Sequence, residues 1–139
     1  MTTLTFNTEK TFTNITQDVQ KLIPKGFNGL VHVFSQHTTC CVRLLEDEIL
    51  LKSDYCVFLE KMASKDGHFR HDIVGIRDVP VHERINGFAH IQALFFPTSE
   101  TIPVIDGVLA IGLWQQICLV ELDGARNRNV IVTLIAEAK

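Results

Sequence analysis

The stretch TIPVIDGVLAIGLWQQICLVELDGARNRNVIVTLIA, residues 101–136, decides the predicted fold. It contains four strand-like apolar runs, at residues 101–105, 108–113, 115–122 and 129–136. Asp-Gly pairs at 106–107 and 123–124 separate the first run from the second and the third from the fourth. Because Asp-Gly between such runs is a strong hairpin signal, the sequence predicts an antiparallel meander over the last third of the chain.

The predicted hairpin at 123–124 also sets the register of three charged residues. A two-residue loop there places Glu121 opposite Arg126, with Arg128 two residues further along the same face. One interpretation is a cross-strand ion pair that contributes under about 1 kcal/mol. The other is that Glu121 orients the two guanidinium groups toward an anionic ligand, because the planar fork of arginine suits phosphate oxygens.

The first two thirds of the chain add helices and further strands. Residues 2–12 are rich in threonine and suit one or two edge strands. Apolar residues at helical spacing predict a first helix that Asn14 caps and Pro24 stops. Residues 29–35 and 40–45 are typical of strands on either side of a polar turn.

Two more helices are expected around a long polar segment. One follows the acidic residues 46–48 and buries a stripe made of Leu51, Tyr55, Phe58 and Met62. The other spans residues 86–94, with Asn86 as its cap. Between them, residues 64–84 lack periodicity, and a polar loop of that length is usually functional or mobile.

Composition limits the class of protein. A chain of 139 residues with 46% hydrophobic and 21% charged residues suits one globular domain over residues 1–139. A net charge of −3 without a Lys/Arg cluster argues against a nucleic-acid partner. No apolar run approaches the roughly 18 residues of a membrane span, and no secretory signal is evident, so we expect a cytoplasmic protein without a membrane partner. The four cysteines form no CxxC pair, which favours reduced, partly buried thiols.

Three histidines are candidates for chemistry. His37 lies in the polar turn, His71 in the long loop and His90 in the third helix, so no local metal-binding spacing links them. They either converge in the fold or are separately exposed or hydrogen-bonded. A convergent cluster could ligate a divalent metal or act in acid–base chemistry near neutral pH. The sequence has no GxSxG, P-loop or Rossmann glycine motif, which argues against the corresponding hydrolase and nucleotide chemistry.

These segments occur in the order of a known family pattern over nearly the whole chain. They are SQHTT at 35–39, Glu46, His71-Asp72, NGFAH at 86–90, TIPV at 101–104, Asp-Gly at 106–107, GLWQ at 112–115, and Glu121 through Arg126 and Arg128. Together they resemble the YjbQ family. The resemblance implies an α+β fold with a strongly bent, mostly antiparallel sheet, half-barrel or sandwich-like, and two to three helices. It also implies a homotrimer with sites near the subunit boundaries.

The resemblance further implies an activity and a set of site residues. A weak thiamine-phosphate synthase activity is attributed to some members, a transferase reaction that joins a pyrimidine pyrophosphate to a thiazole phosphate. Such a reaction needs anion binding and a divalent metal, zinc or magnesium. The implied catalytic residues are His37, His71, His90 and Glu121, and the three histidines are also the implied metal ligands. The implied substrate-binding residues are Thr38, Asn86, Trp114, Gln115, Arg126 and Arg128.

The chain departs from the family pattern at four positions. Leu45, Leu94, Val108 and Leu113 are apolar where the family commonly carries polar residues. If those positions touch the ligand, the protein binds a different ligand or has lost activity. The leading hypothesis is a metal-assisted enzyme or binder of a small phosphorylated or otherwise anionic metabolite. The alternative is a non-catalytic trimeric protein whose histidines and ion pairs stabilise subunit contacts.

Overall fold

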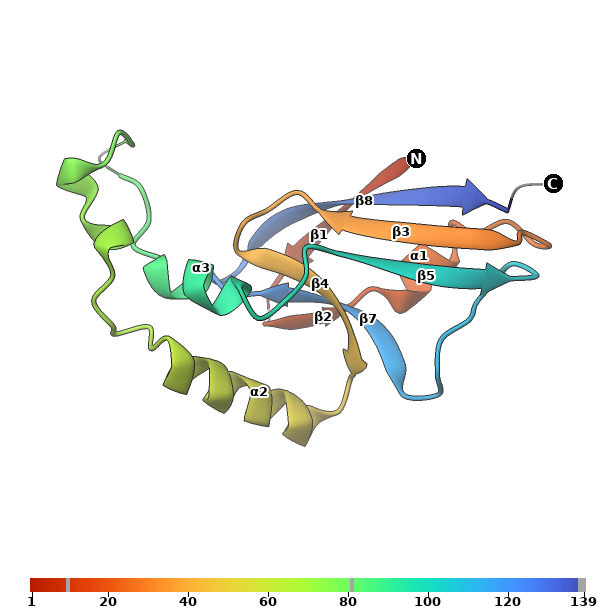
Figure 1. The fold of residues 1–139 in the computed structure, drawn as a ribbon, viewed down its shortest axis with the longest axis horizontal. Coiled ribbons are helices and arrows are strands. Elements are labelled where there is room, and N and C mark those ends of the chain that lie inside the picture. Colours follow the sequence, from red (N-terminus) through yellow and green to blue (C-terminus); the bar gives the residue numbers. More distant parts are fainter. Residues whose placement is uncertain (10, 81, 138–139) are drawn as a thin grey trace.

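The computed structural model describes residues 1–9, 11–80 and 82–137, so the predictions that include Lys10, Val81 and residues 138–139 lie partly outside it. The described residues form eight strands and three α-helices (Figure 1). The strands are β1 (Thr2–Thr8), β2 (Phe12–Asn14), β3 (Gly29–Ser35), β4 (Cys40–Glu46), β5 (Ser99–Ile105), β6 (Val108–Leu109), β7 (Gln115–Glu121) and β8 (Arg126–Ala136). The helices are α1 (Thr16–Gln20), α2 (Ile49–Met62) and α3 (Gly87–Ala93), with two 3-10 turns, η1 (Arg70–Asp72) and η2 (Val74–Ile76).

The strands form two curled antiparallel sheets. One has the order β1-β8-β3-β5-β6 and the other the order β2-β7-β4. In Figure 1 the strands stack together while α2 and α3 extend to one side of them. The α+β class, the bent antiparallel sheet and the presence of three helices are therefore confirmed.

The three-stranded sheet is the middle layer of the molecule. Its central strand β7 carries an uninterrupted apolar run, residues 117–120, and such a run is typical of a strand that is buried on both faces. Ile117 and Leu119 pack into the core between the two sheets, together with α1. Cys118 and Val120 point the other way, into a second core that α2 and α3 cover.

The predicted meander is half right. The Asp-Gly pair at 106–107 does join β5 to β6, with both residues at positive φ, although β6 ends at Leu109 rather than at 113. The hairpin at 123–124 is wrong, because β7 and β8 belong to different sheets. The backbone N–H of Leu122 donates to the Thr39 carbonyl at 3.0 Å. That contact ties the end of β7 to β4, while β8 pairs with β1 and β3.

The helices differ from the expected ones in two respects. On α2, Phe58 and Met62 are about half exposed and Leu59 is the buried residue. Leu51 and Tyr55 are partly buried, and Tyr55 packs against the second core, so the predicted buried stripe is right only in part. On α3, the side chain of Asn86 makes no capping bond, which corrects the predicted cap. None of the described helices has the length and apolarity that crossing a bilayer requires.

The four cysteines are free thiols, as predicted. Burial raises the pKa of Cys40 and of Cys118 to about 12, and that of Cys41 to about 11. Cys40 and Cys41 project into opposite cores, as expected for neighbours in a strand. Because the thiolate is the reactive form, these three cysteines are packing residues.

Candidate functional site

A cavity of about 420 Å³ lies where four segments of the chain meet. The segments are the turn after β3, the loop between α2 and α3 (the strap, residues 64–85), the start of α3 and the start of β8. The residues that line the cavity are Gln36, His37, Thr38, Thr39, His71, Arg77, Val79, Glu83, Asn86, His90, Arg126 and Arg128. The fold therefore gathers all three candidate histidines at one cavity, together with Thr38, Asn86 and both arginines.

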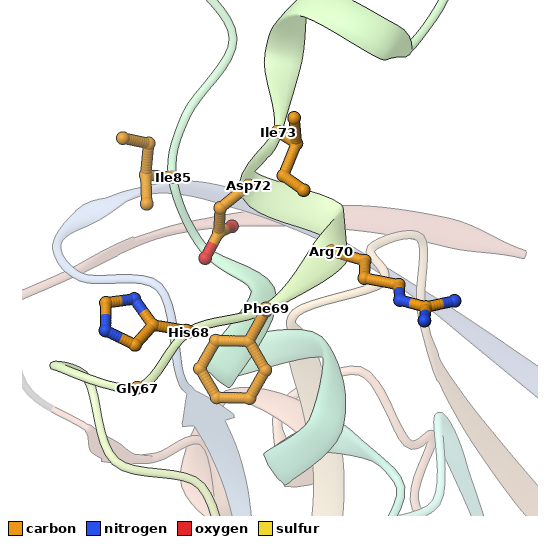
Figure 2. Close-up of a pocket in the computed structure, with 7 residues that line it drawn as sticks. All are labelled: Gly67, His68, Phe69, Arg70, Asp72, Ile73 and Ile85. Atoms are coloured by element: carbon orange, nitrogen blue, oxygen red, sulfur yellow. The ribbon is translucent and has the colours of Figure 1, made fainter.

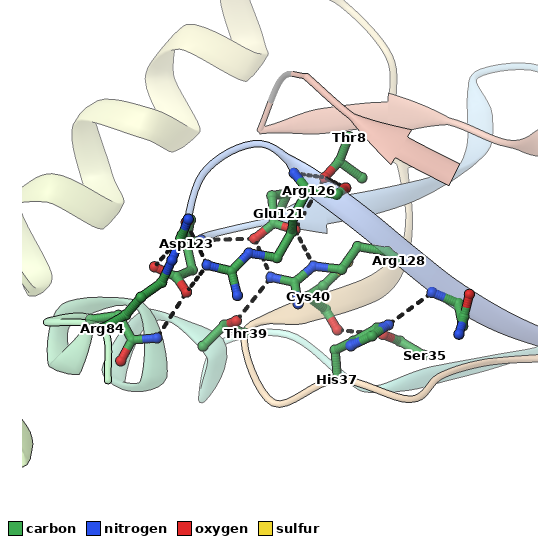
Figure 3. A network of polar contacts seen from close by, with 12 residues as sticks. Thr8, Ser35, His37, Thr39, Cys40, Arg84, Glu121, Asp123, Arg126 and Arg128 are labelled. Atoms are coloured by element: carbon green, nitrogen blue, oxygen red, sulfur yellow. Dashed lines mark hydrogen bonds and ion pairs between the residues drawn. The ribbon is translucent and has the colours of Figure 1, made fainter. Parts of the chain in front are cut away.

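The histidines fall into a pair and a single residue. The rings of His71 and His90 lie beside each other, with centroids 4.5 Å apart and an angle of 39° between the planes. His37 is held separately, because its Nε2 accepts the backbone N–H of Asn129 at 2.8 Å (Figure 3). Neutral His37 must then carry its proton on Nδ1.

Arg128 and Glu121 form a buried ion pair in the wall of the cavity (Figure 3). Two guanidinium nitrogens of Arg128 bind the two carboxylate oxygens, one of them at 2.7 Å, and a further N–H of Arg128 donates to Thr39 Oγ1 at 3.1 Å. Glu121 also accepts the backbone N–H of Asp123 at 2.8 Å. The predicted pairing of Glu121 with Arg126 is wrong, since the hairpin that required it does not form.

Asp123 binds Arg126 instead. Its buried carboxylate accepts from Arg126 at 2.7 Å and from the amide of Asn86 at 2.8 Å, both on Oδ2. Arg84 donates to the Asp123 carbonyl at 2.8 Å. Two buried atoms of this group, Asn86 Oδ1 and Arg126 Nε, have no hydrogen-bond partner within the described part of the chain.

The strap contributes a further arginine to the cavity. Arg77 donates to the carbonyl of His71 at 2.6 Å and lies 3.4 Å from His71 Nδ1. In the described ranges no carboxylate is within ion-pair distance of Arg77, so its charge is not neutralised by a neighbour. The cavity is consequently suited to an anion.

Comparison with known proteins identifies the family. Residues 2–137 match the model described as UPF0047 protein YjbQ-like. The chain belongs to the YjbQ-like UPF0047 family. A UPF0047 protein of Archaeoglobus fulgidus is 34% identical over 119 residues, which cover 86% of each chain. One of Methanothermobacter thermautotrophicus is 35% identical over 107 residues, 77% of this chain and 68% of the relative.

Solved structures of this family share the fold. A protein of Aeropyrum pernix K1, described as hypothetical, superposes with a TM-score of 0.85 at 31% identity and covers 98% of both chains. A YjbQ/UPF0047 family protein of Clostridium acetobutylicum gives a TM-score of 0.81 at 30% identity, covering 97% of this chain and all of that one. The names of these relatives state no substrate or reaction, so membership in the YjbQ-like family shows the fold and leaves the chemistry to the site.

The residues of this YjbQ-like chain do not gather into the metal site predicted from its histidines. No group of three or more His, Cys, Asp or Glu side chains is arranged to hold a metal ion in the parts of the chain described above. His37 Nε2 already accepts a backbone N–H. Arg77 Nη1 lies 3.4 Å from His71 Nδ1, and its charge opposes a cation at that nitrogen. The divalent metal stays a prediction.

Two implied substrate-binding residues lie outside the cavity. Trp114 is 68% exposed and lines a separate hollow of about 390 Å³ with Asn14, Glu46 and Leu113, and Gln115 follows it at the start of β7. Their binding role stays a prediction. Sequence reasoning missed Arg77, Glu83 and Asp123; the first two lie in the polar loop that the lack of periodicity had singled out, and Asp123 was interpreted as a turn residue.

The surroundings of the cavity favour the neutral form of two of its histidines, His37 and His90. Burial, and then the charge of Arg128, lower the pKa of His37. Burial, and then the neighbouring His71, lower the pKa of His90. Neutral imidazoles near neutral pH can accept or donate a proton, which is the requirement for acid–base chemistry at this cavity.

We expect the stability of the protein to fall as the pH drops from 7.5 to 5. The pKa of His37 is lower in the folded chain than in the unfolded chain, where it is about 6.5. Its contribution is therefore complete above that value and is lost as the pH falls through the folded pKa. Protonation also turns Nε2 into a donor that faces the Asn129 N–H. Urea denaturation should show a smaller loss over this range for His37→Gln than for wild type; equal losses would contradict the assignment.

Proposed function

We propose that the cavity binds a small phosphorylated or otherwise anionic metabolite and that His71 and His90 perform acid–base chemistry on it. The observation that supports the proposal best is the meeting of Arg77 and Arg126 with the His71–His90 pair at one cavity. Guanidinium groups match the geometry of phosphate oxygens, and adjacent imidazoles can move a proton near neutral pH. A purely structural ion-pair network would not need an unneutralised arginine at this place.

The two sequence-matched arginines have different roles in this proposal. Arg126 is 29% exposed at its side chain and reaches the cavity, while Asp123 holds one of its nitrogens. Arg128 is 4% exposed and engaged with Glu121, so the two together support the cavity wall. Glu121 then acts through Arg128 as a positioning residue rather than on the ligand itself.

A more specific version of the proposal is a transferase of the thiamine-phosphate synthase type. It rests on the family resemblance, and the anion-binding lining is compatible with its two phosphorylated substrates. The reaction releases pyrophosphate, which makes inorganic pyrophosphate the simplest probe for either version of the proposal.

NMR titration of the histidine ring signals with inorganic pyrophosphate tests the proposed function. We expect the signals of His37, His71 and His90 to shift saturably. His32, which bonds Thr101 on the outer sheet and does not line the cavity, is the internal control and should not shift. Repeating the titration with zinc or magnesium shows whether a divalent metal strengthens binding. Unchanged cavity histidines with and without metal would refute the proposal.

The alternative is a non-catalytic trimer, and one surface favours self-association. Several apolar side chains on α2 and just after α3 are exposed in the single chain: Ile49 (76%), Leu50 (72%), Phe58 (49%), Met62 (51%), Leu94 (80%) and Phe95 (46%). Phe58 of α2 meets Phe95, with ring centroids 5.7 Å apart, and clustered exposed apolar side chains mark interaction sites in soluble proteins. We propose that copies of this chain cover them in a homotrimer, which is compatible with either function.

Light scattering tests the trimer. We expect a mass about three times the 15.7 kDa of the chain, and a smaller mass for Leu50→Glu, because a charge on the covered surface opposes association. A wild-type protein with the mass of one chain at micromolar concentration would contradict the trimer.

A further inference from the structure

The strap reaches the first turn of α3 through one carboxylate. Asp72 Oδ1 accepts the backbone N–H of Asn86 at 3.1 Å and that of Gly87 at 2.8 Å. These N–H groups belong to the start of a helix, where they lack partners within the helix. Asp72 therefore caps α3 from a distance of 14 and 15 residues along the chain, in place of the expected Asn86 side chain.

A glycine lets the strap approach this closely. A Cβ atom at Gly87 would lie 2.5 Å from Cβ of Phe69 and 3.1 Å from Asp72 Oδ1. Any side chain at position 87 would collide with Phe69, so the strap would have to move away. Figure 2 shows Phe69 and Asp72 on the side of the strap that faces α3, while Arg70 points away from it. We call Phe69, Asp72 and Gly87 the clamp.

The clamp brackets a cavity residue. His71 lies between Phe69 and Asp72 in the sequence, and its ring meets that of His90, three residues after Gly87 on α3. His71 in turn holds Arg77 through its carbonyl. Apolar packing does not replace the clamp, because Ile73, Ile76 and Ile85 of the same strap are each about half exposed or more.

We propose that Asp72 and Gly87 are positioning residues that set His71 against His90 and, through His71, bring Arg77 to the cavity. The functional part of this inference rests on the proposed anion-binding function. The geometric part does not, because the contact between the two rings is a property of the protein without ligand. Asp72 thereby acts on the cavity through the backbone of α3 and through its own contact with His71, whose Nδ1 lies 3.7 Å from Asp72 Oδ1, and not by touching the ligand.

The test measures the contact between the His71 and His90 rings and the affinity for pyrophosphate. In wild type we expect a nuclear Overhauser effect between the ring protons of His71 and His90, whose centroids are 4.5 Å apart. It should vanish in Asp72→Ala and Gly87→Ala, and pyrophosphate affinity should fall roughly tenfold, since Arg77 leaves the cavity with His71. Asp72→Asn keeps an oxygen acceptor and should retain both. Asp66→Ala, an exposed carboxylate of the same strap, is the matched control and should resemble wild type.

The outcomes separate the two proposals. Persistence of the ring-to-ring signal in either Asp72→Ala or Gly87→Ala would overturn the positioning role of that residue. A second outcome is that the two variants lose the ring-to-ring signal while no protein, wild type included, binds pyrophosphate. That outcome would support the positioning role and refute the proposed function. Gly87→Ala keeps the carboxylate, so it decides the matter even where Asp72→Ala does not fold.

Discussion

Replacing Arg128 by alanine is expected to lower the free energy of unfolding by about 3–5 kcal/mol. Arg128 and Glu121 are 4% and 3% exposed, and two guanidinium nitrogens hold the two carboxylate oxygens. Removing the guanidinium leaves a buried carboxylate charge without its main partner, which costs more than the pair contributes. Urea denaturation, compared through the midpoint and the slope, measures the loss.

Two further variants make this prediction specific. Arg43 pairs with Glu100 at 3.2 Å but is 51% exposed at its side chain, so Arg43→Ala should cost under about 1 kcal/mol. The double variant Glu121→Gln with Arg128→Met removes both charges and should cost less than Arg128→Ala alone. An Arg128→Ala protein as stable as Arg43→Ala would contradict the burial of this pair.

Replacing Arg126 by alanine is expected to weaken pyrophosphate binding roughly tenfold or more, since a charge-assisted hydrogen bond contributes about 1.5–3 kcal/mol. The guanidinium lines the cavity, and Asp123 holds one of its nitrogens at 2.7 Å. The family resemblance implies a substrate-binding role for Arg128 as well, but its burial makes Arg128 a test of stability instead. Equilibrium dialysis against labelled pyrophosphate gives the ratio of affinities.

The controls for Arg126 distinguish charge from shape. Arg126→Lys keeps the charge but loses the planar fork, so its affinity should lie between those of wild type and the alanine variant. Arg43→Ala changes the net charge by the same amount at a residue that does not line the cavity, so it should bind pyrophosphate as wild type does. Equal affinities of wild type and Arg126→Ala would exclude Arg126 as a ligand arm.

Local patterns predicted the elements well and their pairing less well. The apolar run at residues 117–120 and the Asp-Gly turn at 106–107 act through neighbouring residues, and both features are present in the fold. The pairing of β8 with β1 and β3 joins segments from opposite ends of the chain. A turn signal carries no information about such distant partners, so Asp-Gly at 123–124 predicted a hairpin where the chain passes between sheets.

In the candidate site, too, the residues could be predicted from the sequence but their pairing could not. The family resemblance indicated His37, His71 and His90, and the fold does bring them to one cavity. Which residues pair could not be predicted, because the ion pair of Glu121 with Arg128 and the bond of His37 to Asn129 depend on the tertiary arrangement. In the sequence, Asp72 is only a neighbour of His71 in a family motif. Its role as the cap of α3 could not be predicted, because it depends on the strap folding back onto α3.

Calorimetric titration of inorganic pyrophosphate into the wild-type protein, at two temperatures and at low and high salt, tests whether the cavity binds an anion. We expect saturable binding at one site per chain that weakens as salt increases, because cationic side chains provide the attraction. An absence of saturable heat at both temperatures, up to millimolar pyrophosphate and with or without zinc or magnesium, would contradict it.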